Sequence, residues 1–302
     1  MVIFNGKEFS KSILEDLKKR ISLLSFVPEF SDILIGNDGP SLRYVNMKKN
    51  IAEDLMISFI DGNLDKSCTT ESVINKIKEL VLRPNICGII VQLPLPNHID
   101  TQKVLDFIPL DLDVDGLSNT YSNSFYNTQD FTDMLIMPTV SAVKKILDEA
   151  VNNNSSSANF EEGGKNIAIV GQGRLVGKPI THLLQIQNTL IHKGGQVKII
   201  DSQTDEILKK EILKNADIII TAVGKPGIIK GNEIKQDVIV IDAGTLEIEN
   251  VLLGDIDFET VSQKASFVTP TPGGVGPVTV ACLMENIISS AEKKVLTKNY
   301  HV

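Results

Sequence analysis

Short runs of apolar, β-branched residues alternate along this chain with longer segments of helical periodicity. In the first half, the apolar runs 33–35, 57–60 and Ile86–Val91 predict strands, and segments 41–55 and 70–82 between them have the spacing of amphipathic helices. Strands that alternate with helices form layered α/β structures. This half therefore predicts a βαβαβ unit.

The predicted strands of the second half are nearly continuous runs of apolar residues. Four strands are predicted there, at residues 166–170, 197–200, 217–220 and 238–241. Continuous apolar strands are typical of a parallel sheet that helices cover on both faces, so we expect a Rossmann-type, doubly wound sheet. The polar segment 151–159, between the halves, predicts a disordered surface loop, and helical spacing returns at about residues 279–294.

The length of 302 residues exceeds what one average core serves, and two α/β domains flanking a cleft are expected. We assign residues 1–140, completed by a C-terminal helix at 279–302, to the first domain, and residues 141–278 to the second, Rossmann-type domain. The active site is expected in the cleft between them, with Lys48 pointing into it.

Composition and charge exclude several classes of protein. The net charge of −8 provides no basic surplus for nucleic acid or an acidic membrane surface. The three cysteines are far apart without CxxC spacing, which indicates neither a disulfide framework nor a zinc site. No apolar run reaches membrane-spanning length. We expect a cytoplasmic protein without nucleic-acid or membrane partners.

A glycine-rich loop follows the first strand of the second half. Gly171, Gly173 and Gly177 form a GxGxxxG pattern between a predicted strand and a helix, where small residues let helix N-terminal amides face a pyrophosphate. A tight strand-to-helix connection is the alternative. Asp201 ends the next strand, where an acid that binds a ribose hydroxyl is expected, although a helix cap or a solvated acid would fit as well.

Polar residues of the first half suggest a second site. Tyr44 and Lys48 are four residues apart and share one helix face, and a lysine that loses hydration in a pocket suits proton transfer near neutrality. Gln92 follows a strand, where ligands of open α/β sheets bind. The alternatives are a surface lysine and a capped strand end. Asp113 and Asp115 lie just before Gly116, and they could be catalytic carboxylates, metal ligands or acids of an Asx turn. We expect no metal there, because no Glu or His cluster accompanies them.

Several longer strings resemble one enzyme family in order, from about residue 30 to residue 290. They are Tyr44-Val45-x-x-Lys48, Val91-Gln92-Leu93-Pro94-Leu95-Pro96, Asp113-Val114-Asp115-Gly116, Val176-Gly177-Lys178-Pro179, Ala222-Val223-Gly224-Lys225-Pro226-Gly227 and Pro272-Gly273-Gly274-Val275-Gly276-Pro277. The chain is thereby similar to the bifunctional methylenetetrahydrofolate dehydrogenase/methenyltetrahydrofolate cyclohydrolase (FolD-like) family. The resemblance implies a cytoplasmic homodimer in one-carbon metabolism and purine biosynthesis, with tetrahydrofolate substrates.

The resemblance also implies roles for individual residues. Lys48 would manage proton transfer in hydrolysis, with Gln92 as its hydrogen-bonding partner. Tyr44 would stack on the folate ring, and Asp115 would accept hydrogen bonds from the pterin. Other residues that would contact the folate are Val91, Leu93, Pro272, Gly273 and Gly276. Residues that would contact the dinucleotide are Gly171, Gln172, Gly173, Arg174, Val176, Gly177, Asp201, Ser202, Ala222, Val223, Gly224 and Thr279.

The dinucleotide loop departs from the family pattern. Members commonly carry Gly-Arg-Ser, whereas this chain has Gln172 at the arginine position and an arginine displaced to Arg174. Asp201 would repel a 2′-phosphate, while Arg174 and Ser202 could reach one. We expect NADP, with NAD as the alternative. The sequence also leaves open an enzyme with only one of the two activities, a non-catalytic folate- or nucleotide-binding homologue, and a shikimate-type dehydrogenase, which would leave the proline-rich strings unexplained.

Overall fold

The computed structural model describes residues 1–37, 39–154, 164–187, 195–249 and 251–299. The chain divides into two compact units. The six-stranded unit comprises Met1–Ser10 and Thr139–Thr279, and the three-stranded unit comprises Lys11–Pro138 and Val280–Val302. We expected residues 1–10 in the first domain. They belong to the six-stranded unit because strand β1 (Val2–Ile3) pairs with β11 (Phe267–Val268) of its sheet.

The sheet of the three-stranded unit is parallel, with the strand order β3-β2-β4. Its strands are β2 (Glu29–Ile33), β3 (Ser58–Asp61) and β4 (Ile86–Val91). The outer two agree with the apolar runs in the sequence. The central strand begins four residues before the predicted start, because residues 29–32 pair with both neighbouring strands. This pairing keeps the polar Ser31 and Asp32 within the strand.

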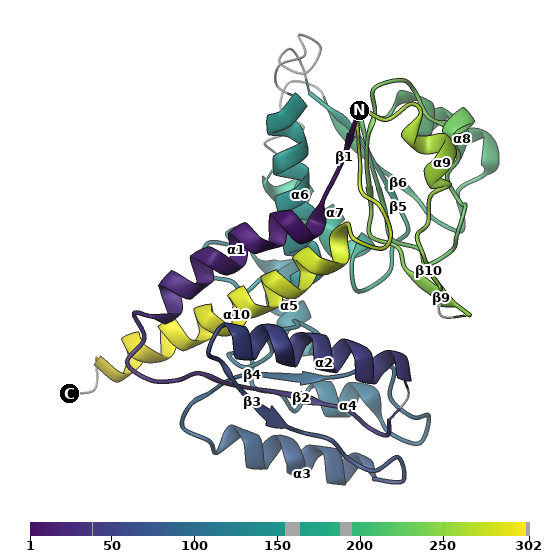
Figure 1. The fold of residues 1–302 in the computed structure, drawn as a ribbon. Coiled ribbons are helices and arrows are strands. Elements are labelled where there is room, and N and C mark those ends of the chain that lie inside the picture. Colours follow the sequence, from purple (N-terminus) through teal and green to yellow (C-terminus); the bar gives the residue numbers. More distant parts are fainter. Residues whose placement is uncertain (38, 155–163, 188–194, 250, 300–302) are drawn as a thin grey trace. The chain divides into compact units, whose positions relative to one another are not determined.

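Helices cover both faces of this sheet (Figure 1). The helices that belong wholly or mostly to this unit are α1 (Gly6–Ile21), α2 (Gly39–Asp54), α3 (Thr70–Val81), α4 (Thr101–Leu105), α5 (Asn119–Asn127) and α10 (Val275–Asn299), and all except α5 contribute to the two core clusters of the sheet. Apolar residues of α3 and α4 pack with Ile33 and Ile89 in one core cluster. Those of α1, α2 and α10 pack with Phe30 and Ile90 in another. The two clusters follow the alternation of side chains along the strands.

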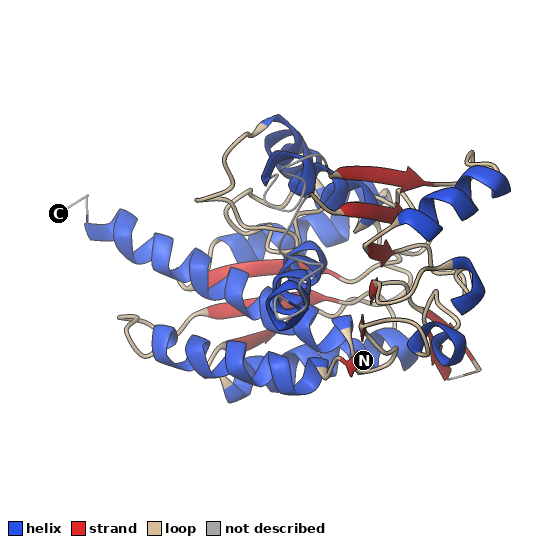
Figure 2. Ribbon diagram, turned by 90° about the horizontal axis from the view of Figure 1, so that it is seen from above, coloured by secondary structure: helices blue, strands red, loops and turns tan. Residues whose placement is uncertain are grey.

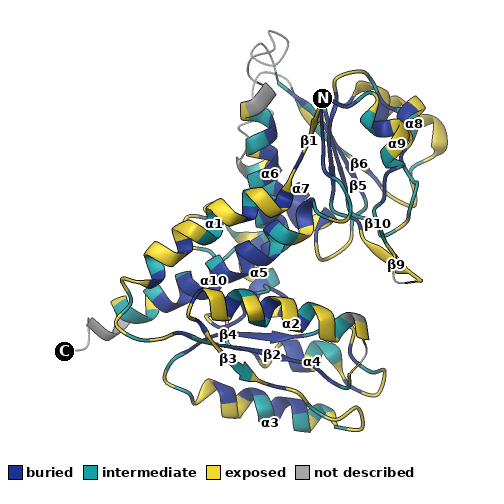
Figure 3. Ribbon diagram, in the orientation of Figure 1, coloured by how far each residue is buried: buried dark blue, intermediate teal, exposed yellow. Residues whose placement is uncertain are grey.

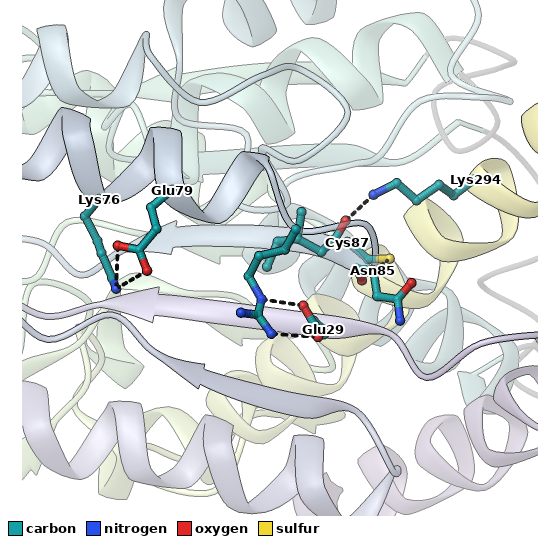
Figure 4. A network of polar contacts seen from close by, with 8 residues as sticks. Glu29, Lys76, Glu79, Asn85, Cys87 and Lys294 are labelled. Carbon is teal, nitrogen blue, oxygen red and sulfur yellow. Dashed lines mark hydrogen bonds and ion pairs between the residues drawn. The ribbon is translucent and has the colours of Figure 1, made fainter.

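Polar contacts fix the beginning of β4 against its neighbours (Figure 4). Arg83 donates two hydrogen bonds to the Glu29 carboxylate, at 2.6 and 2.9 Å, and so connects β4 to the start of β2. The Lys294 Nζ on α10 donates to the Ile86 carbonyl at 2.5 Å. These contacts hold the amino end of the sheet, and Gln92 lies at its opposite end, directly after β4.

The six-stranded sheet is parallel throughout, with the order β1-β11-β8-β7-β5-β6. Its remaining strands are β5 (Asn166–Val170), β6 (Gln196–Ile200), β7 (Ile218–Thr221) and β8 (Ile239–Asp242). The predicted Rossmann-type parallel sheet is confirmed. Figure 3 shows the inner strands β5, β7 and β8 buried, as their continuous apolar sequences require, whereas the edge strands β1 and β6 are largely exposed or half-buried.

The connections of this unit are mostly helical (Figure 2). They are α6 (Pro138–Asn154), α7 (Gly177–Gln187), α8 (Glu206–Asn215), the 3₁₀ turn η1 (Gly231–Glu233), the hairpin of β9 (Leu246–Ile248) and β10 (Val251–Leu253), and α9 (Phe258–Ser262). We predicted a disordered loop at residues 151–159, and this prediction is wrong for residues 151–154, which form the last turn of α6. The apolar face of this helix continues up to that turn, since Leu147 and Ala150 are both buried. Residues 155–159 lie outside the described residues. Within the described part of the chain, no helix has the length and hydropathy of a membrane span.

Candidate active site

Lys48 is a buried lysine, with an exposed fraction of 2%. Its Nζ donates a hydrogen bond to Gln92 Oε1 at 2.9 Å and lies 4.7 Å from the centre of the Tyr44 ring. It also forms an ion pair with Asp32. The alternative of an ordinary surface lysine is therefore wrong.

The local structure explains this arrangement. Tyr44 and Lys48 are one helical turn apart on α2, which places both on the face toward the sheet. The main-chain N–H of Gln92 donates to the Ile33 carbonyl at 2.9 Å and extends the β4 ladder by one residue. The Gln92 Nε2 donates to the Leu93 carbonyl at 3.2 Å, so Oε1 faces Lys48 as an acceptor.

Asp32 was not among the predicted site residues. Because the expected strand began at Ile33, Asp32 was placed outside it, whereas β2 includes Asp32 and buries it completely. Burial raises the pKa of the Asp32 carboxyl, and the charge of Lys48 acts in the opposite direction. The signal in the sequence is an acid between Phe30 and the apolar run that begins at Ile33.

The two acids of the Asp-Val-Asp-Gly string have different environments. Asp113 accepts hydrogen bonds from the main-chain N–H groups of Gly116, Leu117 and Ser118, at 2.9, 3.1 and 2.9 Å, which makes it an organiser of its own turn. Asp115 is half-buried. Burial raises its pKa to about 6, with Lys48 opposing the shift and Asp32 and Asp113 adding to it.

The role that the family resemblance gives Asp115 predicts a pH dependence of folate binding. If its carboxylate accepts hydrogen bonds from the pterin, the KM for methenyltetrahydrofolate should rise as the pH falls from 7 to 5, because protonation replaces an acceptor with a donor. Asp115→Asn should raise KM about 10- to 100-fold at pH 7.5, as expected for loss of a charge-assisted hydrogen bond, and should remove this pH dependence. An asparagine variant whose KM still rises toward pH 5 would assign the effect to another group.

The neighbours of Gln92 on the proline-rich string differ in exposure. The Val91 side chain is buried in the core cluster of α3 and α4, which leaves only its main chain for a ligand. A contact of Val91 with the folate through its main chain stays a prediction. Leu93 is half-buried and stays a candidate.

In the six-stranded unit, the predicted glycine loop lies between β5 and α7. Gly171 has a φ of 98°, which favours glycine, and a Cβ at Gly177 would lie 2.1 Å from the Gly171 carbonyl oxygen. A Cβ at Gly173 would have no atom closer than Ala222 O at 3.9 Å. Gly171 and Gly177 are thus required by the loop itself, whereas Gly173 borders open space beside it.

Side chains around this loop divide into those that support it and those that are exposed. Gln172 Nε2 donates to the Gly171 carbonyl at 3.0 Å and lies 3.1 Å from Thr181 Oγ1, so it is directed into the loop. Val176 is buried. Arg174 and Ser202 are exposed. Asp201, also exposed, accepts hydrogen bonds from the Gln203 N–H and Thr204 Oγ1 through Oδ1, at 2.9 and 3.2 Å.

The Ala222-Val223-Gly224 string follows β7 and is held by an acid that was not predicted. Asp255 accepts hydrogen bonds from the Val223 and Lys225 N–H groups at 2.6 and 2.8 Å. Since β5 and β7 are adjacent in the sheet, this string lies beside the glycine loop, and a Cβ at Gly171 would lie 2.7 Å from the Ala222 oxygen. The carboxyl ends of these strands form the position where open α/β sheets bind ligands.

The proline-rich run before α10 also belongs to the six-stranded unit. Pro272 is exposed, and Gly273 has a φ of 103° and accepts a hydrogen bond from the Gly6 N–H at 2.9 Å. Gly276 is exposed, and the Thr279 hydroxyl donates to the Val275 carbonyl at 3.2 Å. Across the described ranges, no group of three or more His, Cys, Asp or Glu side chains could hold a metal ion.

Comparison with known proteins gives the same family over both halves of the chain. Residues 4–115 match the tetrahydrofolate dehydrogenase/cyclohydrolase catalytic domain, and residues 147–295 match the NAD(P)-binding domain of the same enzymes. The bifunctional protein FolD of Hydrogenobaculum sp. is 36% identical over 98% of this chain and 100% of its own length. That of Nitratiruptor sp. is 37% identical over 97% and 99%.

Solved structures agree with the sequence comparison. The bifunctional FolD dehydrogenase/cyclohydrolase of Campylobacter jejuni has a TM-score of 0.85 at 30% identity, over 97% of this chain and 99% of that one. The Trypanosoma brucei enzyme, solved with NADP and an inhibitor, has the same TM-score at 28% identity, over 97% and 98%. The family prediction is confirmed: this chain belongs to the tetrahydrofolate dehydrogenase/cyclohydrolase family of bifunctional enzymes.

Proposed function

We propose that this chain oxidises 5,10-methylenetetrahydrofolate with NADP and then hydrolyses 5,10-methenyltetrahydrofolate to 10-formyltetrahydrofolate, using Lys48 as the proton-transfer group of the second step. The observation that carries this proposal is the buried Lys48 Nζ, held by Gln92 and Asp32 beside the Tyr44 ring. Gln92 directly follows β4, so the Lys48 Nζ that donates to it lies at the carboxyl end of a parallel strand, where ligands of such sheets bind.

In the hydrolytic step, water must add to the methenyl carbon and lose a proton. Lys48 in its neutral form would accept that proton, because an amine within hydrogen-bond reach of the attacking water is a competent general base. Gln92 fixes the direction of the Nζ through its Oε1. As an ammonium, Lys48 would afterwards return the proton to the ring nitrogen that leaves the same carbon.

Substrate orientation would come from Tyr44 and Asp115. The Tyr44 ring is large and flat, and its contact with Lys48 fixes its position, so it suits stacking on a fused ring system. Asp115 presents a half-buried carboxylate that could accept hydrogen bonds from the pterin amino and ring N–H groups. Together they would hold the folate in one orientation for both reactions.

The dinucleotide would be held in the six-stranded unit by the loop from Gly171 to Gly177 and by the start of α7. The fit rests on the open space at Gly173, which lies just before the N-terminus of a helix of eleven residues. When bound, NADP supplies the acceptor for the hydride of the first step. Arg174 and Ser202 offer a cation and a hydroxyl for the 2′-phosphate, and the NADP complex of the similar Trypanosoma brucei enzyme supports this choice.

The experiment that tests the proposal is an absorbance assay of methenyltetrahydrofolate formation, run with NADP and with NAD at matched concentrations. We expect turnover with NADP and a higher NADP/NAD ratio of kcat/KM, by about tenfold, in Asp201→Asn. Asparagine keeps the acceptor for Gln203 N–H and removes only the charge. An unchanged ratio would mean that this carboxylate does not face the ribose, and no turnover with either nucleotide would restrict the chain to hydrolysis.

The domain boundaries after residue 140 and before residue 279, and the contacts of individual residues with ligands, are part of this proposal. The cytoplasmic location, the homodimer and the supply of purine biosynthesis follow from the family resemblance and stay predictions. Sedimentation of the purified protein tests the dimer.

A further inference from the structure

Asp32 is a buried acid that the proposed reactions do not use. It lies on the central strand β2, between β3 and β4, with an exposed fraction of 0%. Its neighbours on the same face are Phe30 and Ile90, both of the apolar cluster with α2 and α10. An ionised carboxylate in such surroundings is costly unless a cation compensates it.

The only charged partner of Asp32 within the described structure is Lys48, and apart from this ion pair neither Asp32 oxygen has a hydrogen-bond partner among the described residues. Asp113, by contrast, is occupied by three main-chain N–H groups. An ammonium has three donor hydrogens, so Lys48 has one for Asp32, one for Gln92 and one for a substrate or water. Asp32 therefore touches the reacting group from the buried side.

We propose that Asp32 is a positioning residue for hydrolysis that takes the Lys48 proton within the pair, so that Lys48 presents a neutral amine without releasing a proton to solvent. The inference rests on the proposed role of Lys48. The ammonium and the carboxylate exchange one proton to give an amine and a carboxylic acid, and the net charge of the pair stays zero.

The proton balance of the step closes. The amine takes a proton from water as the water oxygen bonds to the methenyl carbon, which leaves an ammonium, a carboxylic acid and a neutral adduct. When the bond from that carbon to the ring nitrogen breaks, the Lys48 ammonium gives its proton to the nitrogen and takes one from the adduct hydroxyl, which forms the formyl group and leaves Lys48 an ammonium. Asp32 then releases its proton to solvent, which accounts for the proton that hydrolysis of the cation produces.

Burial favours this exchange. A neutral acid and amine are easier to accommodate than two ions in an apolar site, and burial raises the pKa of the Asp32 carboxyl. The other titratable groups that face the pair are Tyr44 on α2, Asp61 opposite Asp32 on β3, and Asp113 and Asp115 in the turn. Of these, burial raises the pKa of Asp115 to about 6, so its protonation changes mainly below pH 7. Its proposed role is in folate binding, and kcat at saturating substrate does not report changes in binding.

The test is the pH profile of methenyltetrahydrofolate hydrolysis, corrected for the uncatalysed rate. Wild-type kcat should be level from about pH 6.5 to 8, because the proton moves inside the pair. Asp32→Asn should lower kcat about 10- to 100-fold at pH 7, with KM little changed, and kcat should rise about tenfold per pH unit because Lys48 must first lose its proton to solvent. A variant with a wild-type profile, or one reduced equally at every pH, would overturn the inference.

Ser31→Ala provides the matched control, because Ser31 is equally buried on the same strand, has an unpartnered hydroxyl and faces the other side of the sheet. Its profile should stay level. A second measurement is independent of activity: the ¹³C carboxyl signal of Asp32, assigned by its loss in Asp32→Asn, should titrate at higher pH in Lys48→Met than in the wild type. Equal titration would overturn the pair. If the wild type hydrolyses no methenyltetrahydrofolate, both the proposed function and the inference fail. If Lys48→Met shifts the Asp32 titration but Asp32→Asn keeps the wild-type pH profile of kcat, only the inference is refuted.

Discussion

Replacement of Lys48 by methionine should lower hydrolysis of methenyltetrahydrofolate by about 10²- to 10⁴-fold, the usual contribution of a positioned acid–base group. Methionine keeps the apolar part of the side chain as far as Cε and removes its amine. Hydride transfer to NADP needs no proton from Lys48 in the proposed scheme, so the dehydrogenase should decline far less. The measurement is the rate of each reaction separately, starting from the methylene or the methenyl compound.

Lys49→Met is the matched control for this variant. Lys49 is adjacent on α2 but half-exposed, with its Nζ 3.9 Å from Glu53 Oε1 and 5.7 Å from the centre of the Phe59 ring. Surface pairs of this kind contribute little, so Lys49→Met should hydrolyse methenyltetrahydrofolate at nearly the wild-type rate. A Lys48→Met enzyme as active as Lys49→Met would remove Lys48 from the mechanism.

Loss of Lys48 should also destabilise the fold, because Asp32 loses its cation. Removing one partner of a buried pair costs about 3–5 kcal/mol. The pKa of Asp32 is raised on folding, so the penalty is small below the unfolded value of about 3.9 and grows, by about 1.4 kcal/mol per unit, as the pH rises toward the folded value. Lys48→Met/Asp32→Val should recover stability and stay inactive, which separates unfolding from lost chemistry.

Much of this site could be predicted from the sequence because its signals are local. Helical spacing puts Tyr44 and Lys48 on one face, and the end of a strand places Gln92. Asp32 could not be found in this way, since the strand was taken from its apolar residues and pairing with both neighbours extends β2 over Ser31 and Asp32. A central strand gains enough from its two ladders to include polar residues that propensity alone would place in a loop.

Long-range pairing explains the other differences. The attachment of residues 1–10 to the six-stranded unit depends on the pairing of Val2–Ile3 with Phe267–Val268, more than 260 positions away along the chain. Asp255 supports Val223 and Lys225 from 32 and 30 residues away, and nothing in its own segment distinguishes it from a solvated acid. Such contacts depend on topology, which a periodic pattern does not determine.

The glycines of the nucleotide loop should respond to alanine in two different ways. Gly177→Ala puts a methyl group 2.1 Å from the Gly171 carbonyl oxygen, and a main-chain atom cannot yield as a flexible side chain can. We expect kcat/KM for NADP to fall at least about 100-fold, equivalent to about 2.7 kcal/mol, together with a lower melting temperature. Hydrolysis should change little, because Lys48, Gln92, Asp32 and Asp115 all lie in the other unit.

Gly173→Ala should separate ligand approach from loop structure. Its methyl group would meet no protein atom closer than 3.9 Å, so the melting temperature should stay at the wild-type value. If the pyrophosphate passes over this residue, the methyl group occupies space that the ligand needs, and the KM for NADP should rise about tenfold or more. An alanine variant with the wild-type KM would show that the dinucleotide does not cross Gly173, and loss of stability would show that this glycine, like Gly177, serves the loop.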